Sequence, residues 1–321
     1  MKYVLLFFLQ VVITANAFAQ SKEANDLYSE GKYKEALLAY SETFSNYPLD
    51  SVDPTSFYKA AEDACKLNEL DSAIKYLGFY AEMCKVPQLT IMRLNVNFKK
   101  LHSFIQWPEF EKLLQQKDDS IAQLNHYNLA LRHQLDEMWY DDQHYRYLVT
   151  FDSSIIEDSK KVDSLWTLAD ISDSINIMRL KKLLDQYGWL TKKQVGDVSF
   201  VQWMIIQHSD KSIIDKYLPL LKKQAEKGEV KKADVALTID RANIYAGKKQ
   251  IYGSQITYAD KDKGRPAYIA PLEDPDNVDA RRAKMDLEPI AKYAKSKGIY
   301  WDLEAYKRNL PQFENWDFKN M

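Results

Sequence analysis

The sequence predicts a mostly α-helical protein: N-terminal helical repeats precede a helical C-terminal domain that carries one small β-hairpin. Three observations support this fold class. Only 9 Gly and 10 Pro occur among 321 residues, and Leu, Lys, Ala and Glu, which favour helices, are abundant. Small and aromatic residues recur at helical spacing within residues 24–48. Only residues 250–258 alternate in the manner of a strand.

Residues 1–19 have the features of a secretory signal peptide. Lys2 precedes the apolar run Tyr3–Ile13, and Ala17-Phe18-Ala19 forms a small-x-small cleavage site. We therefore expect cleavage near Ala19/Gln20 and an exported chain, periplasmic or secreted. An apolar run of this length is too short to span a bilayer, and no later segment is long and apolar enough to do so.

Composition excludes several classes of protein. Hydrophobic residues make up 46% of the chain, which supports folded cores, and the formal net charge of −2 does not call for a nucleic acid partner. Cys65 and Cys84 are expected near the far ends of two consecutive antiparallel helices, too far apart for a disulfide. We predict that both are free and buried. No spacing typical of a zinc site or a phosphate loop occurs, so no metal or cofactor is expected.

Residues 20–116 are interpreted as helical repeats that hold a protein or peptide partner. The first unit has small and aromatic residues that let two antiparallel helices approach, a glycine in the turn and a closing proline: Ala24, Leu27, Tyr28, Gly31, Tyr33, Ala36, Tyr40, Phe44 and Pro48. This pattern resembles the tetratricopeptide repeat. A weaker copy begins near Ala61, and residues 89–114 are interpreted as a degenerate third unit or cap. The spacing predicts no strand within residues 21–114.

One long connecting helix is predicted over 117–150, and the α-rich domain over 151–321. Apolar spacing predicts helices over 163–187, 192–208, 211–227 and 231–246, and shorter ones over 277–285 and 289–297. The strand predicted at Gln250–Tyr258 turns through Asp260–Gly264 and pairs with Arg265–Ile269, an edge strand because of Pro266.

The segment 198–210 holds the first candidate site residues. It is nearly uncharged and rich in large apolar side chains, yet it ends on Gln207, His208 and Asp210. His208 shares a helical stripe with Val201 and Ile205, so it is expected to point inward. Asp210 has a competing role as the N-cap of the next helix.

Asp240 is the second candidate, because it lies on the apolar stripe of its own helix. A core-facing carboxylate requires a cation or several hydrogen-bond donors. Its neighbour Arg241 points about 100° away around the helix, so His208, Arg281 and Arg282 are the candidate partners. If Asp240 lines a solvated site, Asp240→Asn is expected to cost less than about 2 kcal/mol.

The predicted hairpin and the segment after it supply the remaining candidates. Alternation places Gln250 and Tyr252 on one face of the strand and Gly253 and Gln255 on the other. An arginine fork at 281–282 suits an anionic small ligand. A salt bridge that joins elements of the domain is an equally good interpretation.

These segments together resemble a family of uncharacterised bacterial domains over about residues 125–300. The resemblance rests on Gln-His-x-Asp at 207–210, Asp-Arg at 240–241, Gln-x-Tyr-Gly-x-Gln at 250–255 and Asp-x-Arg-Arg at 279–282. It implies positions of interest but no activity.

Three functions remain open. The first is an exported binding module, with a protein partner on the repeats and an anionic small ligand in a pocket of His208, Asp240 and Arg281. The second is an exported hydrolase in which His208 is the general base, oriented by Asp240 or Asp210, and Arg281 or Arg282 steadies an oxyanion. The third is a purely structural polar core. Either site hypothesis requires the side chains of the separate segments to converge within about 10 Å.

Overall fold

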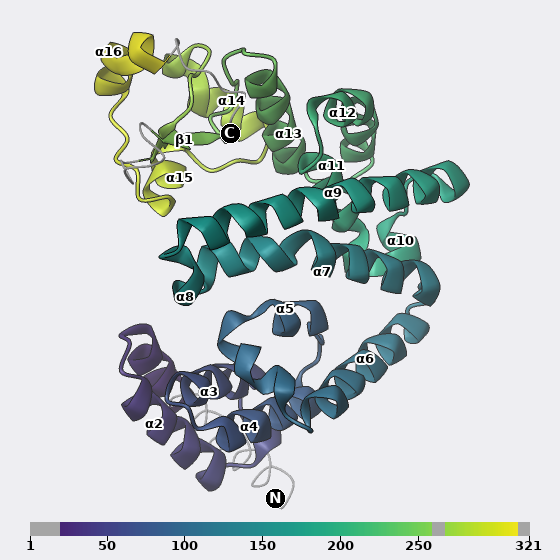
Figure 1. Cartoon of the computed structure of the whole chain (residues 1–321), viewed down its shortest axis with the longest axis vertical. Helices are drawn as coiled ribbons and strands as arrows, with labels where there is room; N and C mark the ends of the chain where they lie inside the picture. The colour runs from purple at the N-terminus through teal and green to yellow at the C-terminus, as the bar shows by residue number, and fades with distance from the viewer. Residues whose placement is uncertain (1–19, 259–266, 314–321) are drawn as a thin grey trace, which may run out of the picture. The chain divides into compact units, whose positions relative to one another are not determined.

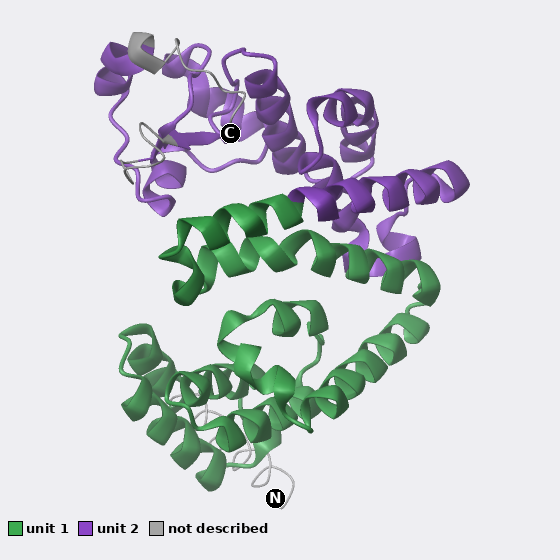
Figure 2. Cartoon of the chain, viewed as in Figure 1, with its two compact units in different colours: residues 1–169 green, residues 170–321 purple. Residues whose placement is uncertain are grey.

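The computed structural model describes residues 20–258 and 267–313. The expected signal peptide, residues 1–19, and the expected turn Asp260–Gly264 with Arg265 and Pro266 lie outside the described residues. The described part is predominantly helical with one two-stranded antiparallel sheet, which confirms the predicted fold class. The chain divides into two compact units, residues 1–169 and 170–321, and the boundary falls within helix α9 (Figure 2).

Unit 1 is built from helices and 3₁₀ turns. After a helix over residues 20–29, its elements are α2 (Tyr33–Asn46), η1 (Leu49–Ser51), α3 (Pro54–Lys66), α4 (Leu70–Met83), α5 (Leu89–Leu94), η2 (Val96–Ser103), α6 (Trp107–Leu124), α7 (Leu129–Phe151) and α8 (Ser153–Ile156). Residues 20–114 contain no strand, as predicted. The further assignment of this region to the tetratricopeptide class stays a prediction.

Small side chains allow the helices of unit 1 to pack closely. Ala60, Ala61 and Ala64 on α3 are fully buried where α3 contacts α2 and α4, and these helices lie side by side in Figure 1. The turn between α3 and α4 spans only three residues and places Asn68 at φ +62°. Cys65 and Cys84 are buried and free, as predicted.

The predicted single helix over 117–150 is wrong, because the structure has α6 and α7 there with a break between them. His126 lies in the break at φ +58°. The Asn128 side chain accepts a hydrogen bond from the Leu131 amide at 3.1 Å and so begins α7. Apolar residues continue at helical spacing on both sides of the break, so the hydrophobic period alone could not reveal it.

Unit 2 contains most of α9 and everything after it. Its elements are α9 (Ser159–Tyr187, which begins in unit 1), α10 (Lys192–Val195), η3 (Gly196–Phe200), α11 (Val201–Gln207), α12 (Lys211–Glu226), α13 (Lys232–Tyr245), β1 (Ile256–Tyr258), β2 (Ala267–Ile269), η5 (Pro275–Asn277), α14 (Val278–Lys284), α15 (Ile290–Ser296) and α16 (Leu303–Phe313). The strands pair in antiparallel register, with Ile256 opposite Ile269.

Three sequence predictions for unit 2 need correction. The helix expected over 192–208 is divided into α10, η3 and α11, and Gly196 at its division has φ +73°. The strand expected over 250–258 is reduced to β1, because residues 250–255 form a loop. Alternation therefore does not define the faces on which Gln250 and Gln255 lie. Helix α16 was not predicted at all.

Polar contacts fix the turn that follows α9. Gln202, fully buried on α11, accepts a hydrogen bond from the Leu190 amide at 2.9 Å and donates to the Leu190 carbonyl at 2.7 Å. The following α10 begins with a capping box formed by Thr191 and Gln194. No helix in the described residues is both long and apolar enough to cross a membrane.

Candidate functional site

Asp240 binds the main chain of a loop rather than a cation. Its Oδ1 accepts hydrogen bonds from the amides of Ile251 and Tyr252 at 2.7 and 2.9 Å. Its Oδ2 accepts from the amide and the hydroxyl of Ser254, both at 2.9 Å. The carboxylate is fully buried, as the apolar stripe of α13 predicted. Asp240 therefore has several hydrogen-bond donors around it in place of a cation. Residues 251–254 fold around its side chain.

The Gln250 side chain forms hydrogen bonds with main-chain groups that stabilise the same loop. Its side-chain Oε1 accepts from the Gln255 amide at 2.8 Å. Its Nε2 donates to the carbonyls of Gln255 and Ala270 at 3.0 and 2.7 Å. Because Gln250 is fully buried, its side-chain oxygen and nitrogen are out of contact with water. They therefore need these hydrogen-bond partners from the protein.

The two arginines of the Asp-x-Arg-Arg segment bind carbonyl groups of this loop. Arg281 Nε donates to the Ile251 carbonyl at 2.9 Å, and Arg282 Nη1 donates to the Tyr252 carbonyl at 2.6 Å. Arg281 also contacts Asp274, through its carboxylate at 3.3 Å and its carbonyl at 2.8 Å. Arg282 is almost completely buried, and burial lowers its pKa. The arginine fork therefore holds α14 against the loop.

Gly253 is required by the shape of the loop. Its φ is +71°, and a Cβ atom at this position would lie 2.8 Å from Ile290 Cδ1 and 3.3 Å from Leu272 Cδ2. Residues with a side chain rarely adopt such a φ. Ile290 and Leu272 thus approach the backbone at Gly253 too closely for a side chain to fit there.

Arg241 and Gln255 connect the loop to α11. Arg241 Nη1 donates to the Gln207 carbonyl at 2.7 Å, and Arg241 Nε donates to Gln255 Oε1 at 3.4 Å. The Gln207 side chain is buried, and its Oε1 has no hydrogen-bond partner among the described residues. Most of the predicted site residues are thus linked through one loop: Gln207, Asp240, Arg241, Gln250, Tyr252, Gln255, Arg281 and Arg282.

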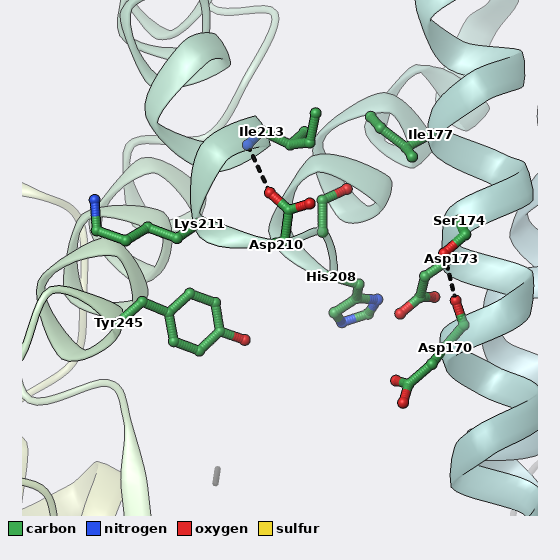
Figure 3. A pocket seen from close by; sticks show the side chains of 10 residues that line it. Asp170, Asp173, Ser174, Ile177, His208, Asp210, Lys211, Ile213 and Tyr245 are labelled. Carbon is green, nitrogen blue, oxygen red and sulfur yellow. Dashed lines mark hydrogen bonds between the residues drawn. The ribbon is translucent and has the colours of Figure 1, made fainter. Parts of the chain in front are cut away.

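His208 lines a separate feature, a cleft of about 470 Å³ within unit 2 (Figure 3). We call it the His208 cleft. It is lined by Asp170, Asp173, Ser174, Ile177, His208, Ser209, Asp210, Lys211, Ile213 and Tyr245. These residues come from α9, from the α11–α12 junction and from the last residue of α13. The volume falls within the range of about 300–1,000 Å³ that is typical of small-molecule sites.

The side chains of His208 and Asp173 point toward one another across this cleft in Figure 3. Ser174 donates its hydroxyl hydrogen to the Asp170 carbonyl at 2.9 Å, within α9. The Lys211 side chain extends away from His208 and forms an ion pair with Asp215. The ionisable side chains that line the cleft are thus three carboxylates, Asp170, Asp173 and Asp210, together with His208, Lys211 and Tyr245.

Asp210 performs the capping role that the sequence left open. Its Oδ1 accepts from the Ile213 amide at 3.0 Å and from the Ser212 hydroxyl at 2.6 Å. These bonds, the Ser212 hydroxyl first, hold the pKa of Asp210 below its usual value. The opposite shift occurs at Asp240, where burial raises the pKa although four donors oppose it.

Sequence reasoning missed the contribution of α9 to the cleft. Asp170 and Asp173 lie three residues apart on that helix, a spacing that places them on one face. Such a pair is commonplace on solvated helix faces, so the sequence gave no reason to single it out. Tyr245 was missed because it is the last residue of α13. In the described part of the chain, no three His, Cys, Asp or Glu side chains are arranged to hold a metal ion.

The fold and the cleft define a class: a helical, α-rich domain with a carboxylate-lined cleft, preceded by helical hairpins. A fold of this kind does not by itself specify an activity. The chain belongs to the family of unknown function DUF6624, whose model matches residues 130–303. This match agrees with the resemblance inferred over about residues 125–300. No curated protein and no solved structure matches the chain.

Proposed function

We propose that this chain is an exported binding protein whose α-rich domain takes a small, positively charged ligand in the His208 cleft. The observation that carries the proposal is the lining of the cleft, in which Asp170, Asp173 and Asp210 all take part. Lys211, which follows Asp210 in the chain and also lines the cleft, is already paired with Asp215. A protonated amine would offset this negative charge and donate hydrogen bonds to the carboxylates.

The contacts of the two arginines favour a cationic over an anionic ligand. Arg281 and Arg282 were the groups expected to bind an anion, and both donate to main-chain carbonyls of loop 250–255. Binding a ligand with these arginines would take donors away from two half-buried carbonyls. Export and a protein partner on the repeats remain part of the proposal, supported by the signal-peptide pattern and by the helical hairpins of unit 1.

Thermal unfolding of the mature chain tests the ligand class. Spermidine, glucosamine and lysine methyl ester are the cationic probes, and citrate and glucuronate are the anionic ones. A ligand that binds only the folded state raises the unfolding temperature with concentration. We expect this response from at least one amine and from neither anion.

Variants then assign the response to the cleft. Asp173→Asn should weaken amine binding at least tenfold, a loss of about 1.4 kcal/mol. Asp163→Asn, an exposed residue of the same helix that does not line the cleft, should leave it unchanged. An unaltered response in Asp173→Asn, or a response to the anions alone, would overturn the proposal.

A hydrolase is the second candidate function, favoured by the facing side chains of His208 and Asp173 (Figure 3). A carboxylate beside a histidine can orient the ring and support it as a general base. In this version Asp173 takes the orienting role expected of Asp240 or Asp210, because the Asp240 carboxylate already accepts four hydrogen bonds. Turnover of ester or amide substrates that is lost in His208→Ala but retained in Asp163→Asn would support it. Equal turnover in His208→Ala and the parent chain would exclude it.

A further inference from the structure

Helix α9 carries an exposed apolar stripe that neither the cleft nor the loop uses. Leu168, Ile171, Ile175 and Met178 are 39%, 51%, 47% and 56% exposed. Their spacing of three, four and three residues places them on one face of the helix. Large apolar side chains grouped on one surface commonly mark an interaction site.

The spacing of the stripe continues beyond its apolar centre. Counting by the same three and four residues reaches Ser164 and Lys161 in one direction and Lys182 and Asp185 in the other. All four of these residues are exposed. The result is a heptad seam with Lys161, Leu168, Ile175 and Lys182 at one core position and Ser164, Ile171, Met178 and Asp185 at the other. It extends over about 36 Å of helix.

We propose that α9 of one chain pairs with α9 of a second copy, in antiparallel orientation, along this seam. An antiparallel pair centred near Asp173 matches Leu168 with Met178 and Ile171 with Ile175 of the other chain. The seam is therefore complementary to itself, which is what a two-fold symmetric interface requires.

The charges at the ends of the seam select the orientation. In the antiparallel register Lys161 falls opposite Asp185 of the other copy, and Lys182 falls opposite the Ser164 hydroxyl. A parallel pair would instead place Lys161 against Lys161 and Asp185 against Asp185, like charges in direct opposition. Lys161 now pairs with Asp158 of its own chain at 3.4 Å, with the lysine side chain 61% exposed. Exposed ion pairs of this kind contribute little to stability. Lys161 can therefore leave Asp158 and pair with Asp185 of the other copy.

The stripe and the His208 cleft use different faces of α9. Asp170, Asp173 and Ile177, which line the cleft, lie more than about 100° around the helix from the centre of the stripe, and Ser174, which also lines it, lies about 80° away. None of the four stripe residues lines the cleft. One exposed stripe on one helix offers a small contact area, so we expect a weak dimer that forms on the order of 10–100 µM.

Sedimentation velocity of the mature chain over about 5–500 µM tests the proposal, since that range brackets a weak interface. The parent chain should show a monomer–dimer equilibrium. Ile171→Glu and Ile175→Glu should each weaken dimerisation at least tenfold. By symmetry, each substitution would bury a carboxylate from both copies in the interface. Ile105→Glu is the matched control, since Ile105 is 90% exposed and lies outside α9; this variant should dimerise like the parent.

Charge reversal tests the register. Lys161→Asp and Asp185→Lys should each weaken the dimer, and the double variant should restore it, because the antiparallel seam regains both pairs. A monomer at every concentration overturns the proposal, as does a dimer indifferent to both isoleucine variants. A monomer that instead co-sediments with vesicles of phosphatidylglycerol assigns the stripe to a membrane surface and overturns it equally.

Discussion

At the scale of single residues, Asp240 shows how a core-facing carboxylate that sequence reasoning nominated for a site can have a structural role. Four donors from residues 251–254 surround it, and it is fully buried. The amides of Ile251, Tyr252 and Ser254 donate to the carboxylate where they would donate to main-chain carbonyls in a helix or a sheet.

Asp240→Asn is therefore expected to destabilise the protein by about 2–4 kcal/mol, the range for a group lost from a buried network. This loss is larger than the one expected from the sequence if Asp240 lined a solvated site. The amide nitrogen of Asn would place a donor against the Ser254 amide. Chemical denaturation measures the loss, and Asp234→Asn, on the same helix but partly exposed, should cost much less. A loss of unfolding free energy below about 1 kcal/mol would instead mean that Asp240 lines a solvated site.

At the scale of elements, loop 250–255 is held both by its own Gln250 and by side chains from three helices. Asp240 comes from α13, Arg281 and Arg282 come from α14, and the Tyr293 hydroxyl of α15 donates to the Ser254 carbonyl at 2.7 Å. Side chains from helices α13, α14 and α15 therefore all bind this one loop. Strands β1 and β2, of three residues each, add little by themselves.

Gly253→Ala tests this arrangement and has a matched control. Gly253 and Gly247 have φ values of +71° and +68°, but only Gly253 has atoms within 4 Å of the added Cβ. Gly247→Ala should cost about 1 kcal/mol, from backbone strain alone. Gly253→Ala should cost at least about 3 kcal/mol, because Ile290 and Leu272 must also move. Equal losses of unfolding free energy in the two variants would show that the loop is not tightly packed.

At the scale of the whole molecule, the stability of the chain should depend on pH through Asp63 of unit 1. This residue is fully buried, and neither carboxylate oxygen has a hydrogen-bond partner in the described part of the chain. Burial raises its pKa from 3.8 to about 7, although Lys66 opposes the shift. Between these two values the unfolded chain releases the proton and the folded chain keeps it, so stability falls as pH rises. Above about 7 the full penalty is present.

Asp63→Asn should consequently raise the stability at pH 8 by about 2 kcal/mol, since each pKa unit is worth about 1.4 kcal/mol and the buried amide has its own cost. The gain should shrink steadily as the pH is lowered toward 4. Thermal unfolding of the parent chain and the variant from pH 4 to pH 8 measures the difference. Asp71→Asn, at an exposed position in unit 1, should show no such trend. A pH-independent difference would mean that Asp63 is ionised in the folded protein.

Local sequence patterns were sufficient for most of the helices, though not for α16 or for the breaks in 117–150 and 192–208, because burial of an apolar face and capping act over a few residues. The cap at Asp210, the capping box at Thr191 and the buried position of Asp240 each follow from residue spacing within a single helix: α12, α10 and α13 respectively. The break at His126 did not follow, since the apolar period continues across it. Alternation over 250–258 suggested a long strand, although most of that segment is a loop.

What only the tertiary structure decided is which polar groups meet. The sequence placed His208, Asp240 and Arg281 in one group of candidates, yet His208 lines a cleft with Asp173, whereas Asp240 and Arg281 hold loop 250–255. The partner of a buried charge comes from whichever element packs against it, often far away in the chain. Spacing within a segment determines that Asp240 is buried and needs donors; it contains no information on whether those donors are cations, amides or a ligand.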